Sequence, residues 1–424
     1  MTYLGEPGGI FLRKHHRRSL AFAAAASALL LLAACSSSKS SSTATTTAGT
    51  AAPGSAAPAA NQPTGSPIVI GTLGALSGPT YAQLGDEQDL SSTPKAWVAW
   101  TNAHGGIDGH PVKLDIIDDA GDPGRAVAAA HQLVADHVIA IVYDFDVGIE
   151  LGYVNYLEQQ GIPVVGGQDY DAVWEQNPDL FPTMATYSAK GYADDYAAHY
   201  AGAKTLAESY CSEQASCKQD VQQQQAAGSE AGVKVILTGS ASSTAPDYTS
   251  QCLTMMSHNP QALYFSNGPP AIEHMATDCK QQGFKGFWVL PNPDASELHN
   301  SALDTFSIGQ DLSLSYFANL PQTQDFHTAM QQYAPGVELK TNSLRAWAAY
   351  DVFKKALEEV PNETPSPQAV RDGLYKLNGF DDNGLTPPLT YSPGKPTVVK
   401  CFILWGIKNG QFVMPQEDKY DCAP

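Results

Sequence analysis

Acidic and amide side chains follow several short apolar runs of this sequence, at positions where they could bind a small polar molecule. Asp144 and Asp146 follow one run, and Asp169 follows the next. Asn292 follows another run much further along the chain. Carboxylates at such positions favour a cation, or a ligand with several hydroxyl or amide groups, because charge-assisted hydrogen bonds are strong.

Motifs for catalysis and for metal binding are missing from the sequence. It contains no Gly-x-Ser-x-Gly, no phosphate-binding Gly-rich loop with Lys-Ser/Thr, and no His-Glu-x-x-His. The run from Asp118 to Asp122 resembles part of a calcium loop but lacks the alternation and the distal Glu, so we interpret it as a strand-to-helix turn. His131 and His137 fall on different helix faces and are interpreted as surface residues. We therefore expect no enzymatic activity, no cofactor and no metal site.

Short β-rich runs alternate with helical stretches through most of the chain. The strands predicted from these runs lie at 68–73, 112–117, 138–143, 162–165, 233–237, 262–265 and 287–290. Asp122 is expected to cap a helix that starts at Pro123. Val127, Ala130 and Val134 recur at helical spacing and should form the buried face of that helix. Strands that alternate with helices at this spacing predict βαβ units and parallel sheets.

Three further elements complete the pattern. They are a helix through Leu151, Val154 and Leu157, an amphipathic helix at 344–360, and a hairpin of strands 397–407 and 411–414. The hairpin should turn at Lys408-Asn409-Gly410. The body from about residue 67 to residue 424 is long for one domain and sufficient for two.

The N-terminus has the features of an export signal. A basic patch from Arg13 to Arg18 precedes an uncharged apolar run from Leu20 to Ala34, which is shorter than the ~20 residues of a membrane-spanning helix. The run ends in Leu-Ala-Ala followed by Cys35, which resembles the lipobox of bacterial lipoproteins, where the Cys is acylated. An ordinary cleavage site beside a Cys is the alternative, and Arg17-Arg18 leaves Sec and twin-arginine export both open. Residues 36–66 are almost only Ser, Thr, Ala, Gly and Pro, so we predict a flexible tether.

The chain is acidic, and its remaining cysteines are even in number. Its net charge of -19 would repel phosphate backbones, so we expect no nucleic-acid partner. The cysteines besides Cys35 are Cys211, Cys217, Cys252, Cys279, Cys401 and Cys422. An even number in an oxidising compartment predicts disulfide bonds, and none of the spacings fits a zinc site. Several pairings are open, and the sequential pairing is the simplest because each bond closes a local loop.

Several motifs resemble the branched-chain-amino-acid-binding proteins of ABC transporters. In order along the chain they are Gly74–Pro79, Gly85, Thr101–His110, Asp118-Asp119, Asp122-Pro123, Asp247–Thr249 and Asp278–Phe284. The resemblance covers nearly the whole body and implies a type I periplasmic-binding fold. That fold is α/β, with two doubly wound lobes of parallel-rich sheet joined by three crossover segments, here placed near Thr186, Tyr316 and Leu389. The lobes would be 67–186 with 316–388, and 187–315 with 389–424.

Such a fold has an expected binding site. Ligands of open parallel sheets bind beyond the carboxyl ends of the strands, so the crevice between the lobes should hold the ligand and close on it by hinge motion. The residues expected to line the crevice are Tyr81, Gln83 and Leu84; Asp144, Asp146, Val147 and Gly148; Gln168, Asp169 and Tyr170; and, from the second lobe, Asn267, Gly268 and Asn292.

Some of these positions depart from the family. Amino-acid binders have hydroxyl-bearing or small residues where Asp144 and Asp169 stand. They also have an acidic residue, which pairs with the ligand's ammonium, near the neutral Asn292. This reversed polarity argues against a plain branched-chain amino acid. Other roles remain open: a helix cap for Asp144, ordinary crevice-edge aromatics for Tyr81 and Tyr170, and a turn for Asn292.

The resemblance and the export signal together imply a role in uptake. We expect an extracytoplasmic protein, anchored through lipid on Cys35 at the outer face of the cytoplasmic membrane or in the periplasm. It would be monomeric and would deliver a small polar organic molecule, an amino acid or a related compound, to the membrane permease of an ABC importer. A sensor that signals to a membrane receptor or kinase is the alternative. A secreted hydrolase is a third hypothesis, disfavoured by the missing nucleophile and base.

Overall fold

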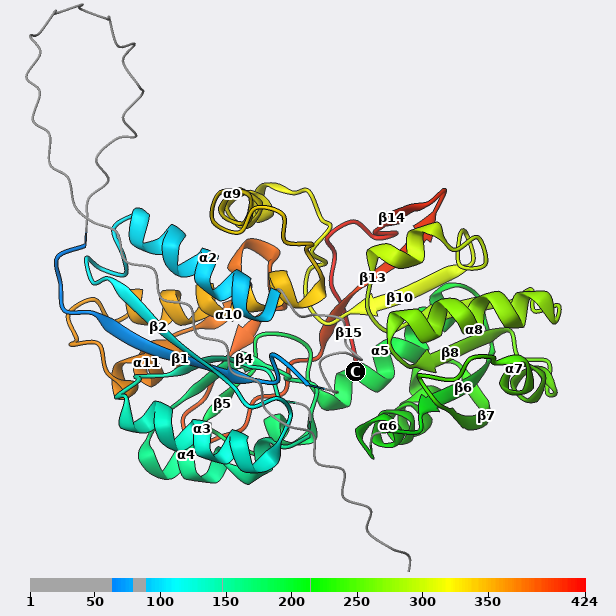
Figure 1. The fold of residues 1–424 in the computed structure, drawn as a ribbon, viewed down its shortest axis with the longest axis horizontal. Coiled ribbons are helices and arrows are strands. Elements are labelled where there is room, and N and C mark those ends of the chain that lie inside the picture. Colours follow the sequence, from blue (N-terminus) through cyan, green and yellow to red (C-terminus); the bar gives the residue numbers. More distant parts are fainter. Residues whose placement is uncertain (1–62, 79–88, 147, 214) are drawn as a thin grey trace, which may run out of the picture. The chain divides into compact units, whose positions relative to one another are not determined.

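The computed structural model describes residues 63–78, 89–146, 148–213 and 215–424, all within the compact unit Ala57–Pro424 (Figure 1). The first of two large sheets has parallel strands in the order β2-β1-β3-β4-β5. They are β1 (Ile68–Gly74), β2 (Val112–Asp118), β3 (Ile141–Asp144), β4 (Val164–Gly167) and β5 (Leu180–Phe181). This strand order is typical of a doubly wound sheet.

Helices cover both faces of the first sheet. They are α2 (Asp89–Ala103), α3 (Pro123–Ala135), α4 (Val154–Gln160), α10 (Thr341–Glu358) and α11 (Pro367–Leu374). α2, α10 and α11 share one core with the sheet, centred on Trp97 and Tyr350. α3 and α4 share a second core with the opposite face, which includes Leu133 and Trp174. Figure 1 shows the sheet between these two helical layers.

Helix α3 starts where the sequence predicts, and of the three residues predicted for its buried face only Ala130 is fully buried. Asp122 caps the helix by accepting a hydrogen bond from the backbone N–H of Arg125, and Pro123 is the first helical residue. The buried residues are Ala126, Ala129, Ala130 and Leu133. The predicted Val127 and Val134 are only partly buried. The small alanine side chains let the helix approach the sheet closely, which leaves the two valines at the margin of the contact.

The second sheet has the strand order β14-β13-β10-β9-β8-β6-β7. Its strands are β6 (Thr205–Cys211), β7 (Lys234–Ala241), β8 (Ala262–Ser266), β9 (Phe287–Leu290), β10 (Ser307–Asp311), β13 (Cys401–Lys408) and β14 (Gln411–Val413). Strands β6 to β10 are parallel, and β13 joins β10 antiparallel. The helices that cover its two faces are α5 (Tyr187–Tyr200), α6 (Ala215–Ala231), α7 (Thr249–Met256) and α8 (Pro269–Gln281).

Three segments carry the chain between the two sheets, and backbone hydrogen bonds join them. The N–H of Ala185 donates to the carbonyl of Leu312 over 2.8 Å, and the N–H of Thr186 donates to the carbonyl of Val399 over 2.9 Å.

The remaining elements are η1 (Glu150–Gly152), η2 (Ala172–Glu175), η3 (Ala295–His299), η4 (Pro321–Thr323), α9 (Gln324–Tyr333), β11 (Asn378–Phe380), η5 (Asp382–Gly384), β12 (Leu389–Thr390) and β15 (Asp421–Cys422). The predicted fold, α/β with two doubly wound, parallel-rich sheets, is confirmed.

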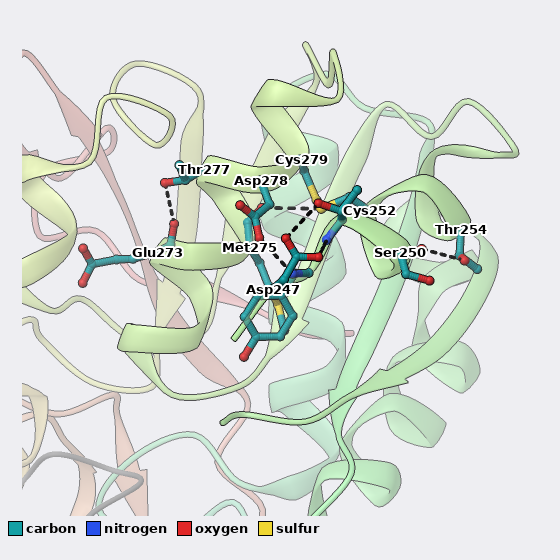
Figure 2. Close-up of a disulfide and its surroundings, with 11 residues drawn as sticks. Asp247, Ser250, Cys252, Thr254, Glu273, Met275, Thr277, Asp278 and Cys279 are labelled. Atoms are coloured by element: carbon teal, nitrogen blue, oxygen red, sulfur yellow. Dashed lines mark hydrogen bonds between the residues drawn. A yellow bond between two sulfur atoms is a disulfide. The ribbon is translucent and has the colours of Figure 1, made fainter. Parts of the chain in front are cut away.

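Three disulfide bonds join the cysteines in the sequential pairing. They are Cys211–Cys217, Cys252–Cys279 and Cys401–Cys422. Figure 2 shows the second of these bonds, which connects α7 to α8 in a fully buried position. Beside it, a carboxylate oxygen of Asp278 accepts a hydrogen bond from the backbone N–H of Tyr248 over 2.8 Å. The start of α7 is therefore held to α8 at two points.

Other predicted elements are found with small differences. The C-terminal hairpin turns at Asn409 and Gly410, whose φ angles of 56° and 67° are the positive values that a tight hairpin turn requires. The helix predicted through Leu151 is divided into η1 and α4, and the Leu151 side chain is 67% exposed. Among the residues that the structure describes, no helix has the length and apolar character needed to cross a membrane.

Candidate functional site

The predicted binding loops lie at the carboxyl ends of strands in both sheets. Asp144 is the last residue of β3, and Gln168 directly follows its neighbour β4. In the second sheet, Asn267 follows β8 and Asn292 lies just beyond β9. Neighbouring parallel strands end at the same edge of a sheet, so each pair of loops is brought to one edge. The other predicted residues Tyr81, Gln83, Leu84 and Val147 lie outside the described residues.

Asp144 and Asp146 belong to a buried acidic cluster that also contains Asp119. None of the three side chains is exposed. The hydroxyl of Tyr153 bridges the first two, 2.8 Å from Oδ1 of Asp144 and 2.7 Å from Oδ2 of Asp146. Burial raises the pKa of Asp144 to about 8. Burial, followed by repulsion from Asp144 and Asp119, raises the pKa of Asp146 to about 10. Burial therefore favours the protonated form of both carboxyl groups.

The helix-cap interpretation of Asp144 is wrong. The next helical turn, η1, begins after Ile149, and no side chain caps it. Tyr153 precedes α4, again without a side-chain cap. Both carboxyl oxygens of Asp144 instead lie within hydrogen-bonding distance of the hydroxyl of Tyr153. A contact between Asp144 and a ligand stays a prediction.

The loop after β3 also contacts a second pair of acidic residues, Glu150 and Asp171. Gly148 is exposed, and its backbone N–H donates to Oδ2 of Asp171 over 2.8 Å. Glu150 is buried beside them, and its pKa is raised by burial and then by the negative charge of Asp171. The carboxyl edge of the first sheet is thus rich in acidic groups that share hydrogen bonds.

Asp169 holds the backbone that leads towards the first crossing between the sheets. Its Oδ2 accepts hydrogen bonds from the backbone N–H groups of Thr183, over 2.6 Å, and of Met184, over 3.0 Å. Burial raises the pKa of Asp169 to about 8, although these bonds oppose the shift. Tyr170 is half-buried against the core of the second sheet, and Gln168 is buried at the same edge. This loop from the first sheet therefore reaches the second.

Asn267 and Gly268 lie where the second sheet meets its helix α8. The amide nitrogen of Asn267 donates to the hydroxyl of Ser243 over 2.9 Å. The neighbouring Ser242 donates to Oε1 of Glu213 over 2.6 Å, so the loops after β6, β7 and β8 are connected. Gly268 precedes Pro269 at the start of α8. Asn267 is thus part of a hydrogen-bonded group of three loops at the carboxyl edge of the second sheet.

Asn292 contacts a buried arginine that the sequence did not single out. Nη2 of Arg345, on α10, donates to Oδ1 of Asn292 over 3.1 Å and to Oδ1 of Asp311 over 2.6 Å. Arg345 and Asp311 are both buried. Burial raises the pKa of Asp311, and the guanidinium of Arg345 counters this shift. Arg345 therefore connects a helix of the first sheet to the end of β10 and to the loop after β9.

The same loop also contacts the start of α10 and Lys340, the residue before it. Nζ of Lys340 lies 3.1 Å from Oδ2 of Asp294, and the hydroxyl of Thr341 donates to the carbonyl of Pro293 over 3.2 Å. Helical spacing puts Arg345 on the same face as Val352 and Ala356, but charged side chains are rarely buried, so we did not expect it in the interior. The available signal was the position of Arg345 between the core residues Leu344 and Trp347, but nothing in the sequence indicates its partner.

No group of three or more His, Cys, Asp or Glu side chains able to hold a metal ion occurs within 63–78, 89–146, 148–213 and 215–424. In the acidic cluster around Asp144, the hydroxyl of Tyr153 contacts Asp144 and Asp146, and burial raises the pKa of both carboxyl groups. The carboxyl and amide groups of these loops can form hydrogen bonds with a ligand. Arg345 contacts one of the amide groups, that of Asn292.

Comparison with known proteins connects this geometry to a family. The periplasmic binding protein family matches residues 67–411. Leu/Ile/Val-binding protein homolog 3 of Brucella melitensis is 24% identical over 370 residues, which cover 82% of this chain and 93% of that protein. The resemblance inferred from the sequence motifs is confirmed.

Solved structures share the fold. A branched chain amino acid ABC transporter protein from Thermus thermophilus with bound valine has a TM-score of 0.70 at 15% identity, covering 84% of this chain and 97% of that one. A fatty acid ABC transporter substrate-binding protein from Thermomonospora curvata also has a TM-score of 0.70, at 18% identity, covering 86% of this chain and 94% of that one. At these identities the likeness establishes the fold.

Proposed function

Because the chain belongs to the periplasmic binding protein family, we propose that it captures a small polar organic molecule outside the cytoplasm and delivers it to an ABC importer. The observation that carries the proposal is the pair of doubly wound sheets, connected by three hydrogen-bonded crossings, with polar loops at their carboxyl edges. Such an arrangement can close on a ligand by rotation about the crossings.

The ligand is an amino acid or a related polar compound. Names of relatives support a small organic ligand but differ in its chemistry: Leu/Ile/Val in the Brucella melitensis protein's name, and a fatty acid in that of the Thermomonospora curvata protein. The carboxyl, amide and tyrosine groups at the loop edges favour a ligand that forms hydrogen bonds. The protein binds this ligand without converting it, and a compound recovered chemically altered after incubation would overturn that part of the proposal.

The two lobes comprise residues 67–186 with 316–388, and 187–315 with 389–424. The hydrogen bonds from Ala185 to Leu312 and from Thr186 to Val399 support the first two crossings, but they favour a third crossing near Val399. Leu389 and Tyr391 pack in the core of the first sheet, which argues against the predicted boundary at 389. Small-angle scattering of the purified monomer should show a more compact particle when ligand is added. A profile unchanged by a ligand that binds would contradict hinge closure.

The protein is held at the outer face of the cytoplasmic membrane, or in the periplasm, by lipid on Cys35. The apolar run that ends in Leu-Ala-Ala-Cys and the small, polar tether at 36–66 support this anchor, which gives the binding lobes reach towards a membrane permease. Wild-type protein should partition with membranes, and the Cys35→Ala variant should not. Equal partitioning of the two would refute lipid anchoring.

The test of binding is a thermal-shift screen against amino acids, amides, polyamines, polyols and aromatic acids. Ligand at 100 times its Kd stabilises the native state by about 2.7 kcal/mol, since the stabilisation is RT ln(1 + [L]/Kd). That gain corresponds to a rise of several degrees in Tm. Compounds that raise Tm should then be measured by titration calorimetry. If no compound in the screen binds, the proposed capture role is wrong.

A further inference from the structure

The loop after β9 is held in place at each of four successive residues. The carbonyl of Pro291 accepts a hydrogen bond from the side-chain amide of Gln310 over 3.3 Å. Arg345 donates to the side chain of Asn292, and Thr341 donates to the carbonyl of Pro293. Lys340 forms an ion pair with Asp294. These contacts come from β10, from α10 and from Lys340 directly before α10, so the loop has little freedom to change its conformation.

The contact with Arg345 determines which way the amide of Asn292 faces. A guanidinium group has hydrogen-bond donors and no acceptor, so only the amide oxygen of Asn292 can face it. Oδ1 accordingly lies 3.1 Å from Nη2 of Arg345. The amide nitrogen, which carries two donors, must therefore point away from Arg345. Asn292 as a whole is exposed at the carboxyl edge of the second sheet.

Arg345 is itself fixed. Its Nη2 lies 2.6 Å from Oδ1 of Asp311, and neither side chain is more than a few per cent exposed. The other oxygen of Asp311 accepts a hydrogen bond from Ser315 over 3.0 Å. Separating a buried ion pair leaves an uncompensated charge in the protein interior, which is strongly unfavourable. Arg345 therefore keeps its orientation, and so does the amide that it contacts.

We propose that Asn292 determines specificity by donating a hydrogen bond from Nδ2 to the ligand, and that Arg345 positions it. The ligand presents an acceptor here, such as a carboxylate or an amide oxygen, and not an ammonium group. A carboxylate at position 292 would offer an acceptor instead and would favour the opposite ligand group. This inference rests on the proposed capture function and names the ligand chemistry at one point of that site.

The experiment uses matched compounds that differ only in the polar group. Each series has a carboxylate, a primary amide and an amine on one hydrocarbon skeleton: 4-methylpentanoate, 4-methylpentanamide and 4-methylpentylamine, and then benzoate, benzamide and benzylamine. L-leucine and L-glutamine are measured alongside. Within any series that binds the wild-type protein, the acid and the amide should bind at least about 10-fold more tightly than the amine.

Two substitutions decide whether Asn292 is responsible. Asn292→Asp should weaken every acceptor-bearing compound that binds by about 10- to 100-fold and should favour the amine. Asn362→Asp makes the same chemical change at an exposed position beyond α10 and should leave every affinity unchanged. An amine that binds best to the wild-type protein, or an Asn292→Asp variant with unchanged affinities, would overturn the inference while leaving the capture function intact.

The role of Arg345 is tested through selectivity. Arg345→Lys keeps a positive charge near Asp311 but removes the planar group that holds Oδ1 of Asn292. The ratio of acid to amine affinities should fall towards one, and a loss of stability alone would not change that ratio. An unaltered ratio in the folded variant would show that Arg345 does not position Asn292. If the variant does not fold, the Asn292→Asp comparison decides the question. Absence of binding by all compounds, and by the wider screen, would refute the capture function and this inference with it.

Discussion

The carboxyl group of Glu208 should make the stability of the protein depend on pH. Glu208 lies on β6 on the face covered by α5, and its side chain is fully buried. Neither of its carboxyl oxygens has a hydrogen-bond partner among the described residues. Burial, followed by repulsion from Asp195 and Asp194, raises its pKa from about 4.5 to about 9, and Lys190 only partly opposes this. The group is therefore protonated in the folded protein at neutral pH and ionised in the unfolded chain.

The sign and size of the effect follow from proton linkage. Between the unfolded pKa of about 4.5 and the folded pKa of about 9, the folded state binds one more proton than the unfolded state. The free energy of unfolding then falls as pH rises, by about 1.4 kcal/mol per pH unit. From pH 6 to pH 8, Glu208 alone should lower the free energy of unfolding by up to about 2.7 kcal/mol.

Glu208→Gln tests this directly, because glutamine has nearly the same shape and does not ionise. Urea unfolding of both proteins at pH 6, 7 and 8, followed by tryptophan fluorescence, gives the free energy of unfolding. The variant should gain about 2.7 kcal/mol relative to wild type between pH 6 and pH 8. Glu230→Gln, at an exposed position on α6, is the matched control and should stay parallel to wild type. Parallel pH profiles for wild type and Glu208→Gln would refute the reasoning.

Two further predictions concern stability. Tyr153→Phe removes the hydroxyl that lies between Asp144 and Asp146 and should lower the free energy of unfolding by about 1–3 kcal/mol in urea at pH 7. A change within about 0.5 kcal/mol would show that this hydroxyl contributes little. Replacing both Cys252 and Cys279 by Ala opens a loop of sequence separation 27 and should cost about 3–4 kcal/mol. Equal urea midpoints for this double variant and wild type would contradict that estimate.

The course of the chain could be predicted because its local signals agree with one another. The strand predicted at 287–290 is found with those bounds, since four large apolar residues stand between turn-forming segments. The cap at Asp122 and the turn at Asn409-Gly410 were also predicted, because each depends on the conformational preference of one or two residues. The alternation of strands and helices then restricts the topology to a doubly wound sheet.

Details of packing were harder to predict. Periodicity identified α3 but assigned Val127 and Val134 to its buried face, where the structure has Ala126 and Ala129. Alanine contributes little to a hydrophobic pattern, yet its small size allows a helix to lie close against a sheet. Leu151 is apolar and at helical spacing, but it is 67% exposed because the chain forms a separate turn there.

The sequence predicted which loops follow the carboxyl ends of strands, but it did not predict the contacts between their side chains. The carboxyl ends of strands identify Asp144 and Asn292, because topology alone determines which loops meet. Topology does not show that Asp144 is held by Tyr153, nor that Asn292 is held by Arg345. Those contacts depend on side chains from other elements, whose directions are determined only when the two sheets and α10 are in place.

The three crossings between the sheets have a consequence for the order of folding. The first sheet ends with β5 at Phe181, but α10 and α11, which complete its core, begin only at Thr341 and Pro367. All of β6 to β10 is synthesised in between. During vectorial synthesis or translocation, one face of the first sheet is therefore covered only in part, by α2, until α10 and α11 have been made. Such high contact order slows folding, and the exposed face makes the unfinished chain a natural client for chaperones.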